Sequence, residues 1–339
     1  MNLSLMLPNY LESAEKSVLI DVRSEGEYNQ GHIPNAINIP LLNNEERAIV
    51  GTIYKQKGNT EAIQKGFELV GGKFSDYITR AKELAINNAI SVYCWRGGMR
   101  SNIMAWLFST AGFQVNLLNG GYKTFRNQAL QSFEIKSKYL ILGGKTGSGK
   151  TEMLQHLKNY GEQVIDLEAL ANHRGSAFGG IGKSHQPTNE QFENDLYWQL
   201  RKLNSAKLIW LENESRLIGK VKIPDAIYEQ MRTARIVEMT VPYALRVNRI
   251  VKEYGVFSVE ILEETTRKIE KKLGNLRMKQ AIEHLHNNEI EQWAIMMLEY
   301  YDDFYAYGLS KRATESIDYV EILNDDFEEQ VNNILKMKF

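Results

Sequence analysis

The sequence contains little cysteine and no long apolar run. Cys94 is the single cysteine among 339 residues, so no internal disulfide can form, and a free thiol is typical of a reducing compartment. No apolar window reaches the ~18 residues of a membrane-spanning helix. The short apolar run 3–7 lacks the basic flank of a secretory signal. We therefore expect a cytoplasmic protein that makes no membrane contact.

An excess of one charge is also missing. The chain has 41 Lys and Arg against 42 Asp and Glu, which leaves a formal net charge of −1. This balance is typical of a globular enzyme, and it excludes an overall basic surface for nucleic acid. Any nucleic-acid partner must therefore bind a local basic patch. The length predicts about two domains.

Apolar strand-like runs alternate with helical patterns, which predicts an α/β fold with parallel sheets. In the first part the strand candidates are 17–23, a short segment within 32–40, 89–93 and 115–118. In the second part they are 138–142, 164–166, 208–212 and 236–239. After Pro242 strand signals almost vanish. We expect a first domain over residues 1–130, a second over 136–242, and a helical region over 243–339 packed on the second.

The only cysteine begins a run that contains glycines and arginines. Cys94 follows the apolar run 89–93 and precedes a helix that we expect from Asn102. A thiolate is stabilised by arginines, backbone N–H groups and a helix N-terminus, which this pattern supplies. A lone strand cysteine is more often only a buried apolar residue, but Arg96 and Arg100 favour a reactive thiol. The rest of the predicted anion loop is Trp95, Gly97, Gly98, Met99 and Ser101.

The N-terminal part resembles a rhodanese domain. The likeness is carried by Asp21-Val22-Arg23, by Glu27, by residues 31–36 (Gly-His-Ile-Pro-Asn-Ala) and by the Cys94 loop. In that family the loop cysteine carries a persulfide, so the resemblance implies a carrier role for Cys94.

The spacing from Cys94 to Arg100 departs from common sulfurtransferases by one added residue. It resembles the C-x5-R loop of cysteine phosphatases and rhodanese-like phosphatases, which holds a phosphate-like anion. The loop is therefore either a phosphatase signature or a cradle for a chalcogen–phosphate donor. Phosphatases usually have histidine before the cysteine, and Tyr93 stands there instead, which disfavours the phosphatase.

A second anion loop matches the phosphate-loop pattern G-x-x-x-x-G-K-[ST]. Its residues are Gly144, Lys145, Thr146, Gly147, Ser148, Gly149, Lys150 and Thr151. The loop lies between the strand candidate 138–142 and an amphipathic run at 152–157. Backbone N–H groups and Lys150 would bind a diphosphate, and Thr151 could hold magnesium. The pattern does not decide between ATP and another organic diphosphate.

Polar residues at the ends of later strands are candidates for supporting roles around this loop. Asp166 and Glu212 are candidates for the second magnesium contact, with solvated strand ends as the equal alternative. The glycine-bearing stretches 173–182 and 212–224 contain Arg174 and Arg216. Such stretches follow strands where α/β proteins place ligands, but alone they favour surface loops. The six histidines show no convincing metal-ligand spacing, and we expect no metal centre and no tightly bound cofactor.

The two loops, the stretches 173–182 and 212–224, and the run 120–126 (Gly-Gly-Tyr-Lys-Thr-Phe-Arg) together resemble the tRNA 2-selenouridine synthase family. The resemblance covers nearly the whole chain and weakens over the last 90 or so residues. It implies a transferase that converts wobble 2-thiouridine in tRNA to 2-selenouridine. The family's sulfur is first alkylated from geranyl diphosphate, and selenium then comes from selenophosphate. An enzyme that supplies selenophosphate would then be a partner.

We hypothesise that the Gly144–Thr151 loop binds the diphosphate of the prenyl donor. The Cys94 loop would bind the selenium donor or carry selenium as a selenenyl sulfide. Trp95 could stack on the target base or belong to the core. The apolar stretch 293–305 favours core over a prenyl channel.

A basic cluster in the C-terminal part is the densest candidate for tRNA contact. Its residues are Arg267, Lys268, Lys271, Lys272, Arg277 and Lys279, with Arg246 and Arg249 nearby in sequence. Phosphate contacts of this kind give affinity without base specificity. A solvated helix face balanced by Glu263, Glu264 and Glu270 is the equal alternative.

Two other functions remain open from the residues. One is a small-molecule sulfurtransferase or C-x5-R phosphatase fused to an ATP-using phosphate-loop module, which would turn over ATP without RNA. The other is a non-catalytic binding module, in which the Cys94 thiol would be unreactive.

Overall fold

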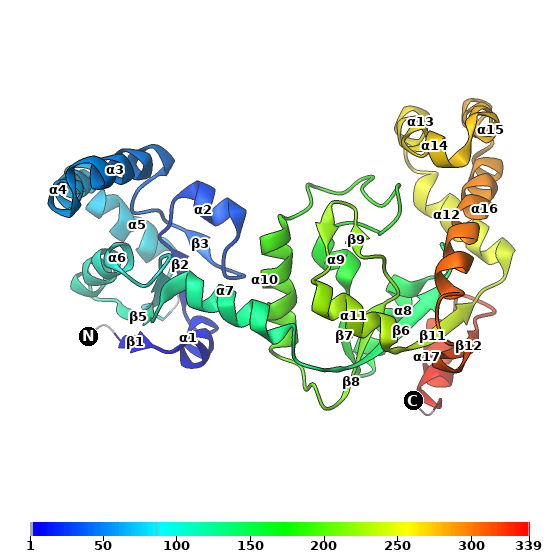
Figure 1. The fold of residues 1–339 in the computed structure, drawn as a ribbon, viewed down its shortest axis with the longest axis horizontal. Coiled ribbons are helices and arrows are strands. Elements are labelled where there is room, and N and C mark those ends of the chain that lie inside the picture. Colours follow the sequence, from blue (N-terminus) through cyan, green and yellow to red (C-terminus); the bar gives the residue numbers. More distant parts are fainter. Residues whose placement is uncertain (1–2, 86, 338) are drawn as a thin grey trace. The chain divides into compact units, whose positions relative to one another are not determined.

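The computed structural model describes residues 3–85, 87–337 and 339, and the chain divides into two compact units (Figure 1). Unit 1 comprises residues 1–132 together with 193–198, and unit 2 comprises 133–192 and 199–339. Residues 193–198 lie inside the range 136–242 expected for the second domain. They group with unit 1 because Asn194 donates to Tyr122 Oη (2.7 Å) and to the His32 carbonyl (3.0 Å).

Unit 1 is built on a parallel five-stranded sheet. Its strand order is β1-β5-β4-β2-β3. The strands are β1 (Leu3–Leu5), β2 (Val18–Asp21), β3 (Ile37–Asn38), β4 (Ala89–Tyr93) and β5 (Gln114–Leu118). The helices are α1 (Leu7–Ala14), α2 (Glu25–Gln30), α3 (Asn44–Lys57), α4 (Asn59–Val70), α5 (Phe74–Leu84), α6 (Met99–Thr110) and α7 (Gly121–Ser132), with a 3₁₀ turn at Gly71–Lys73.

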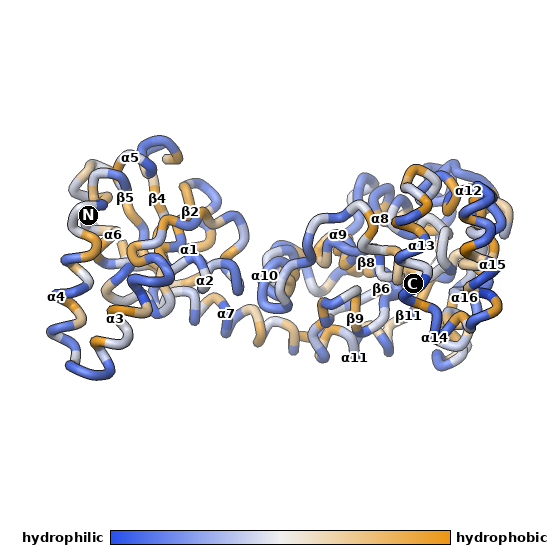
Figure 2. Tube along the Cα trace, turned by 90° about the horizontal axis from the view of Figure 1, so that it is seen from above, coloured by the Kyte–Doolittle hydropathy of each residue, from blue (hydrophilic) through white to orange (hydrophobic). Residues whose placement is uncertain are grey.

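The core of unit 1 lies along its central strands. Ile20 of β2, Ile90 and Val92 of β4, and Met104 and Phe108 of α6 are fully buried. Central parallel strands are covered on both faces, so they are apolar throughout. Figure 2 shows this, because the tube is largely hydrophobic along β2 and β4 and largely hydrophilic along α10 (Asn189–Leu200).

Unit 2 is built on a second parallel sheet, with the strand order β12-β11-β6-β8-β7. Its strands are β6 (Lys138–Gly144), β7 (Gln163–Ile165), β8 (Leu208–Glu212), β11 (Arg235–Thr240) and β12 (Ile317–Glu321), and a small hairpin joins β9 (Leu217–Ile218) to β10 (Val221–Lys222). Its helices are α8 (Lys150–Asn159), α9 (Leu167–Ala171), α11 (Asp225–Thr233), α12 (Tyr243–Tyr254), α13 (Val259–Lys268), α14 (Glu270–Leu273), α15 (Asn275–His286), α16 (Ile290–Leu309) and α17 (Phe327–Leu335), with a 3₁₀ turn at Thr314–Ser316. Only the ends of α10 belong to unit 2, because residues 193–198 group with unit 1.

The α/β class with parallel sheets and a helical C-terminal part is confirmed. One strand, β12, lies where the sequence showed almost no strand signal. Only Val320 of its five residues is buried, and Tyr319 is 61% exposed, because β12 is an edge strand. Pairing with β11, rather than local propensity, makes this segment a strand.

The helices after Pro242 form a core of their own in unit 2. In this part of the chain α16 packs against α12 and α15, and α13 packs against α15. Trp293, Met297 and Tyr300 of α16 are buried in this core with Phe178 and Tyr254. The apolar stretch 293–305 thus contributes mainly to the core. No helix in the described ranges is long and apolar enough to cross a membrane.

Candidate active site

The Cys94 thiol lies over the first turn of α6. The helix begins at Met99, so the predicted start at Asn102 was wrong, and Gly98 takes the N-cap position. The Gly98 N–H donates to Cys94 Sγ (3.3 Å), and Ser101 Oγ lies 3.2 Å from the same sulfur. A sulfur in this position meets the positive end of the helix dipole. An anion bound to the thiol would receive the same N–H donors.

The first turn of α7 holds the backbone of this loop by hydrogen bonds. The N–H groups of Tyr122 and Lys123 donate to the carbonyls of Cys94 (2.8 Å) and Trp95 (3.0 Å). Gly121 has φ +64°, and a Cβ there would overlap the Cys94 carbonyl and the Gly97 nitrogen. Glycine is needed here because the two backbones approach so closely. This explains why the Gly-Gly run at 120–121 accompanies the cysteine loop.

The two loop arginines differ in their surroundings. Arg96 is exposed, whereas Arg100 pairs with Glu27 of α2 at 2.7 Å. Arg47 of α3 pairs with the same carboxylate at 3.0 Å. Burial alone would raise the pKa of Glu27, but the hydrogen bond and charge of Arg100, with the Ser24 N–H and Arg47, lower it. Glu27 therefore stays ionised and holds both guanidinium groups beside the loop.

Other residues that carry the rhodanese resemblance are structural. Asp21 and Arg23 form a buried ion pair at 2.6 Å, and the Arg23 guanidinium lies 3.9 Å from the centre of the Tyr122 ring.

Trp95 is 37% exposed, and its ring centre lies 5.7 Å from that of Tyr122. One face of Trp95 thus contacts the core while part of the ring reaches solvent. Met99, at the start of α6, is 50% exposed.

The phosphate loop joins β6 to α8 as its pattern predicts. Gly149 has φ +81° in the left-handed region and leads directly into Lys150, the first residue of α8. Lys150 Nζ donates to the Gly144 carbonyl (2.9 Å), and the Ser148 N–H donates to the Lys145 carbonyl (3.0 Å). Ser148 Oγ is buried, and no described residue bonds to it. The loop is thus closed by its own lysine and has a free hydroxyl inside.

Two arginines of α12 support this loop, although the sequence suggested them only as neighbours of the basic cluster. Arg246 donates to the Thr146 carbonyl (2.9 Å), and Arg249 donates to the Gly147 carbonyl (3.2 Å). Asp302 of α16 pairs with Arg246 (2.5 Å) and with Lys145 (3.2 Å). The loop's basic side chains are therefore held by a carboxylate that lies far away in sequence.

Tyr305 of α16 is a further loop contact without a local sequence signal. Its hydroxyl accepts from the Gly144 N–H (2.6 Å) and donates to Glu238 of β11 (2.5 Å). Burial, then the charge of Glu238, raise the pKa of Tyr305. The phenol therefore stays protonated and links the loop to the sheet.

A group of carboxyl side chains lies beside α8. Glu212 is fully buried and accepts from the N–H groups of Leu167 (3.1 Å) and Glu168 (3.2 Å). Burial, then Asp166, Glu168 and Glu214, raise its pKa well above the ordinary value. Burial, followed by Glu168, raises the pKa of Glu214 to about 8. Glu214 therefore holds its proton at neutral pH.

The two acids suggested as magnesium contacts have different surroundings. Asp166 caps α9 by accepting from the Ala169 N–H (2.7 Å), whereas Glu212 belongs to the carboxyl group beside α8. Thr151 Oγ1 lies 3.4 Å from Glu168 Oε2, a contact that the sequence did not suggest. Among the residues that the structure describes, no three His, Cys, Asp or Glu side chains form a metal-binding group.

The remaining predicted residues of unit 2 are two arginines and the basic cluster. Arg174 lies next to the carboxyl group, because a Cβ at the adjacent Gly175 would be 2.7 Å from Glu214 and 3.1 Å from Glu168. Arg174 pairs with Glu253 (3.0 Å), and Arg216 pairs with Asp225 (3.0 Å) at the start of α11. All six residues of the basic cluster are exposed on α13, α14 and α15. Within it, Arg267 and Lys268 pair with glutamates one helical turn away, at 2.6 and 3.0 Å. Lys272 lies over the Phe304 ring.

Comparisons with known proteins match each part of the chain to a family. A family model described as a tRNA 2-selenouridine synthase AAA domain matches residues 137–337, and a rhodanese-like domain model matches residues 8–128. The tRNA 2-selenouridine synthase of Nitrosomonas europaea is 36% identical, with 87% of this chain and 89% of that protein covered. The Sulfurovum protein of the same name is 35% identical over 87% and 90%, and the Bdellovibrio bacteriovorus one is 33% identical over 92% and 94%.

Proposed function

Because the chain belongs to the tRNA 2-selenouridine synthase family, we propose that it converts wobble 2-thiouridine in tRNA to 2-selenouridine in two steps, one at each anion loop. The first step attaches a geranyl group to sulfur, and the second replaces the geranylated sulfur by selenium. A thiocarbonyl sulfur is a poor leaving group, whereas an alkylated sulfur departs as a thiol. Alkylation is therefore the activation step.

The phosphate loop holds geranyl diphosphate in the first step. The base sulfur attacks the first carbon of the geranyl group, the carbon–oxygen bond breaks, and diphosphate leaves with the electron pair. The base loses its N3 proton. Lys150 and the N–H groups of the loop stabilise the negative charge that develops on the diphosphate. Thr151 is the residue that would hold a magnesium ion arriving with the diphosphate.

The Cys94 loop holds selenophosphate in the second step. Selenium adds to C2 of the base, the C2–S bond breaks, and geranyl thiol leaves after it takes a proton. Cys94 Sγ then attacks phosphorus, which breaks the P–Se bond and releases 2-selenouridine, and water later frees phosphate from the cysteine. No oxidant or reductant is needed. A selenenyl sulfide on Cys94 would instead require a thiol to release the selenium, so the donor-binding role is favoured.

One observation carries the proposal beyond the family name. The chain has two anion loops of different chemistry, one with Cys94 Sγ in reach of the Gly98 N–H and one with Lys150 but no thiol. A reaction that displaces diphosphate needs only a cradle, whereas cleavage of a P–Se bond gains from a thiol. The exposed basic cluster on α13–α15 is the proposed contact for the tRNA backbone.

The test is mass spectrometry of nucleosides from RNA that carries 2-thiouridine, after incubation with the protein, geranyl diphosphate and selenophosphate. The expected result is an S-geranyl nucleoside that appears first and 2-selenouridine that follows. Unchanged 2-thiouridine beside an active control enzyme would contradict the proposal. Turnover of ATP without RNA would favour a small-molecule sulfurtransferase or phosphatase.

A further inference from the structure

A pocket in unit 1 lies between α3, α4 and the first turn of α6. We propose that it receives the geranyl chain of S-geranylated tRNA during selenation, an inference that rests on the proposed function and adds the binding site for the leaving group. Its cavity is about 350 Å³. A ten-carbon chain needs roughly 300 Å³ if each carbon takes about the ~30 Å³ of a water molecule in the liquid.

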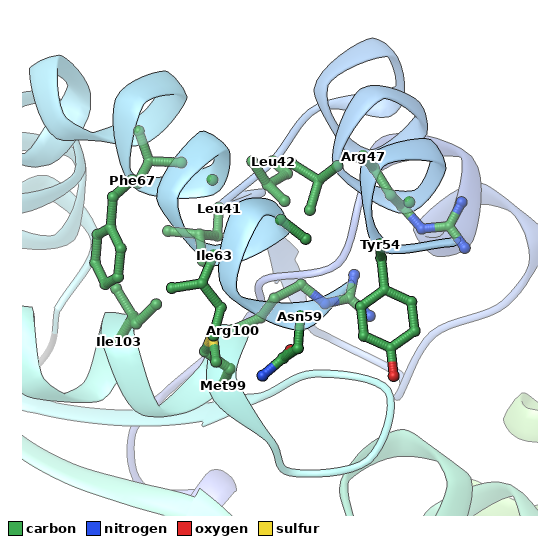
Figure 3. A pocket seen from close by; sticks show the side chains of 15 residues that line it. Leu41, Leu42, Arg47, Tyr54, Asn59, Ile63, Phe67, Met99, Arg100 and Ile103 are labelled. Carbon is green, nitrogen blue, oxygen red and sulfur yellow. The ribbon is translucent and has the colours of Figure 1, made fainter. Parts of the chain in front are cut away.

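The pocket is apolar at one side and basic at the other (Figure 3). Ile63, Phe67 and Ile103 lie together on one side, and Tyr54, Asn59 and the Arg100 guanidinium lie on the other. Tyr54 and Phe67 are 59% and 49% exposed although they are large and mainly apolar. Exposed apolar groups around a concave site are typical of ligand binding.

The helix pair α3–α4 leaves this space open. No residue of α3 is buried, and its half-buried Val50 packs against the core of unit 1 and also lines the pocket. Gly51 and Gly66 lie inside α3 and α4, where glycine costs about 1 kcal/mol relative to alanine. Both line the pocket, and a Cβ at either position would meet no atom within 4 Å. Packing does not require these glycines, whereas a ligand in the pocket would need the space.

The pocket is continuous with the Cys94 loop. Met99 and Arg100 belong to that loop sequence, and both line the pocket. They follow Gly98, whose N–H donates to Cys94 Sγ, so the thiol and the pocket share the first turn of α6. A second apolar hollow extends from Met99 and Phe67 to Trp106. A base bound at the thiol would thus have an apolar channel beside it.

The charges around the pocket favour the same ligand. Arg47 and Arg100 share the single carboxylate of Glu27, which leaves one positive charge uncompensated among the three groups. An apolar chain attached to a polyanion such as RNA matches this combination of an apolar wall and a basic rim. The geranyl group is an apolar chain of this size that the proposed reaction places beside Cys94.

The proposed reaction supplies every atom that this step requires. Selenium adds to C2, the C2–S bond breaks, and geranyl thiol leaves into the pocket after taking a proton. The pocket thus binds the chain before the reaction and the thiol product after it. An S-methyl base would undergo the same bond changes without filling the pocket.

The test compares binding of two RNA stem-loops, one with S-geranyl-2-thiouridine and one with S-methyl-2-thiouridine, to the full chain without selenophosphate. We expect the geranyl RNA to bind at least about tenfold more tightly, since burial of two methylenes has about that effect. Gly66→Leu and Gly51→Leu fill the pocket and should reduce this preference to about threefold or less. Leucine also favours helix, so both variants should fold.

Gly71→Leu is the matched control, because Gly71 has helical dihedrals, has no atom within 4 Å of an added Cβ and does not line the pocket. It should keep the wild-type preference. Equal binding of both RNAs to the wild type, or an unchanged preference in Gly66→Leu, would overturn the inference. A dimer that Gly66→Leu dissociates would assign the pocket to a second copy and overturn it as well.

Addition of selenophosphate separates this inference from the proposed function. If the wild type converts S-geranyl RNA to 2-selenouridine but binds both RNAs equally, only the pocket assignment fails. If it converts neither RNA, the proposed function fails, and the pocket assignment fails with it.

Discussion

The two anion loops reach the same kind of geometry with different surroundings. The Cys94 thiol contacts the Gly98 N–H and Ser101 Oγ, and Glu27 pairs with Arg100 of the same loop and with Arg47. The Gly144–Thr151 loop instead lies between the arginines of α12 and a group of carboxyls that includes Glu212 and Glu214. The Cys94 loop offers a nucleophilic thiol. The phosphate loop lies beside carboxyl groups whose protonation depends on the charge of a bound ligand.

This difference indicates how one chain can separate two reactions. A diphosphate in the phosphate loop would bring negative charge close to Glu214, which is protonated at neutral pH. No such group is placed beside the Cys94 thiol by the described contacts, where an apolar pocket is found instead. The first site therefore suits an anionic leaving group, and the second suits an apolar one.

Lys150→Ala should have the largest effect on the phosphate loop and would sharpen the comparison. Removal of this cation should slow S-geranylation by at least ~100-fold, the typical effect of losing a group that stabilises transition-state charge. Selenation of RNA that is already S-geranylated should continue at the wild-type rate. Quantification of both nucleosides by mass spectrometry checks this, with Lys158→Ala on the exposed end of the same helix as the control. Equal loss of both steps would contradict separate sites.

A smaller effect concerns the carboxyl group beside α8. The folded-state pKa of Glu214, about 8, is raised above its unfolded value. Its contribution to stability is therefore complete at low pH and is lost as the pH rises through 8. The melting temperature of the ligand-free protein should fall by about 5 °C between pH 5 and pH 8. Glu214→Gln should remove part of this slope, since Glu212 and Glu168 contribute in the same direction.

Thermal unfolding at several pH values measures this slope for both proteins. A Glu214→Gln slope equal to that of the wild type would show that Glu214 is ionised throughout the range. The proposed electrostatic difference between the phosphate loop and the Cys94 loop would then be wrong.

The sequence predicted both loops and the α/β class because each depends on local pattern. The strand before Cys94 and the strand before Gly144 are continuous apolar runs, and the glycines that follow mark the turns. The start of α6 was missed because Gly98, at the N-cap position, has no side chain that could cap the helix. The edge strand β12 was missed because only one of its five residues is buried.

The residues that surround the loops could not be predicted, because their contacts span long sequence distances. Asp302 and Tyr305 lie on a helix that is mainly core, and no motif near them points to the phosphate loop 157 and 161 residues away. From the sequence, Arg246 was identified only as a basic residue near the proposed tRNA-binding cluster. The pocket beside Cys94 likewise depends on how α3 and α4 pack relative to α6. The pattern of residues in the sequence does not specify this packing.

The most direct test of the two-site account is the product formed by Cys94→Ala from RNA that carries 2-thiouridine, with geranyl diphosphate and selenophosphate both present. The account predicts that S-geranyl-2-thiouridine accumulates at the wild-type rate and that no 2-selenouridine forms. Loss of the S-geranyl product in this variant would contradict the division of the two steps between the two loops.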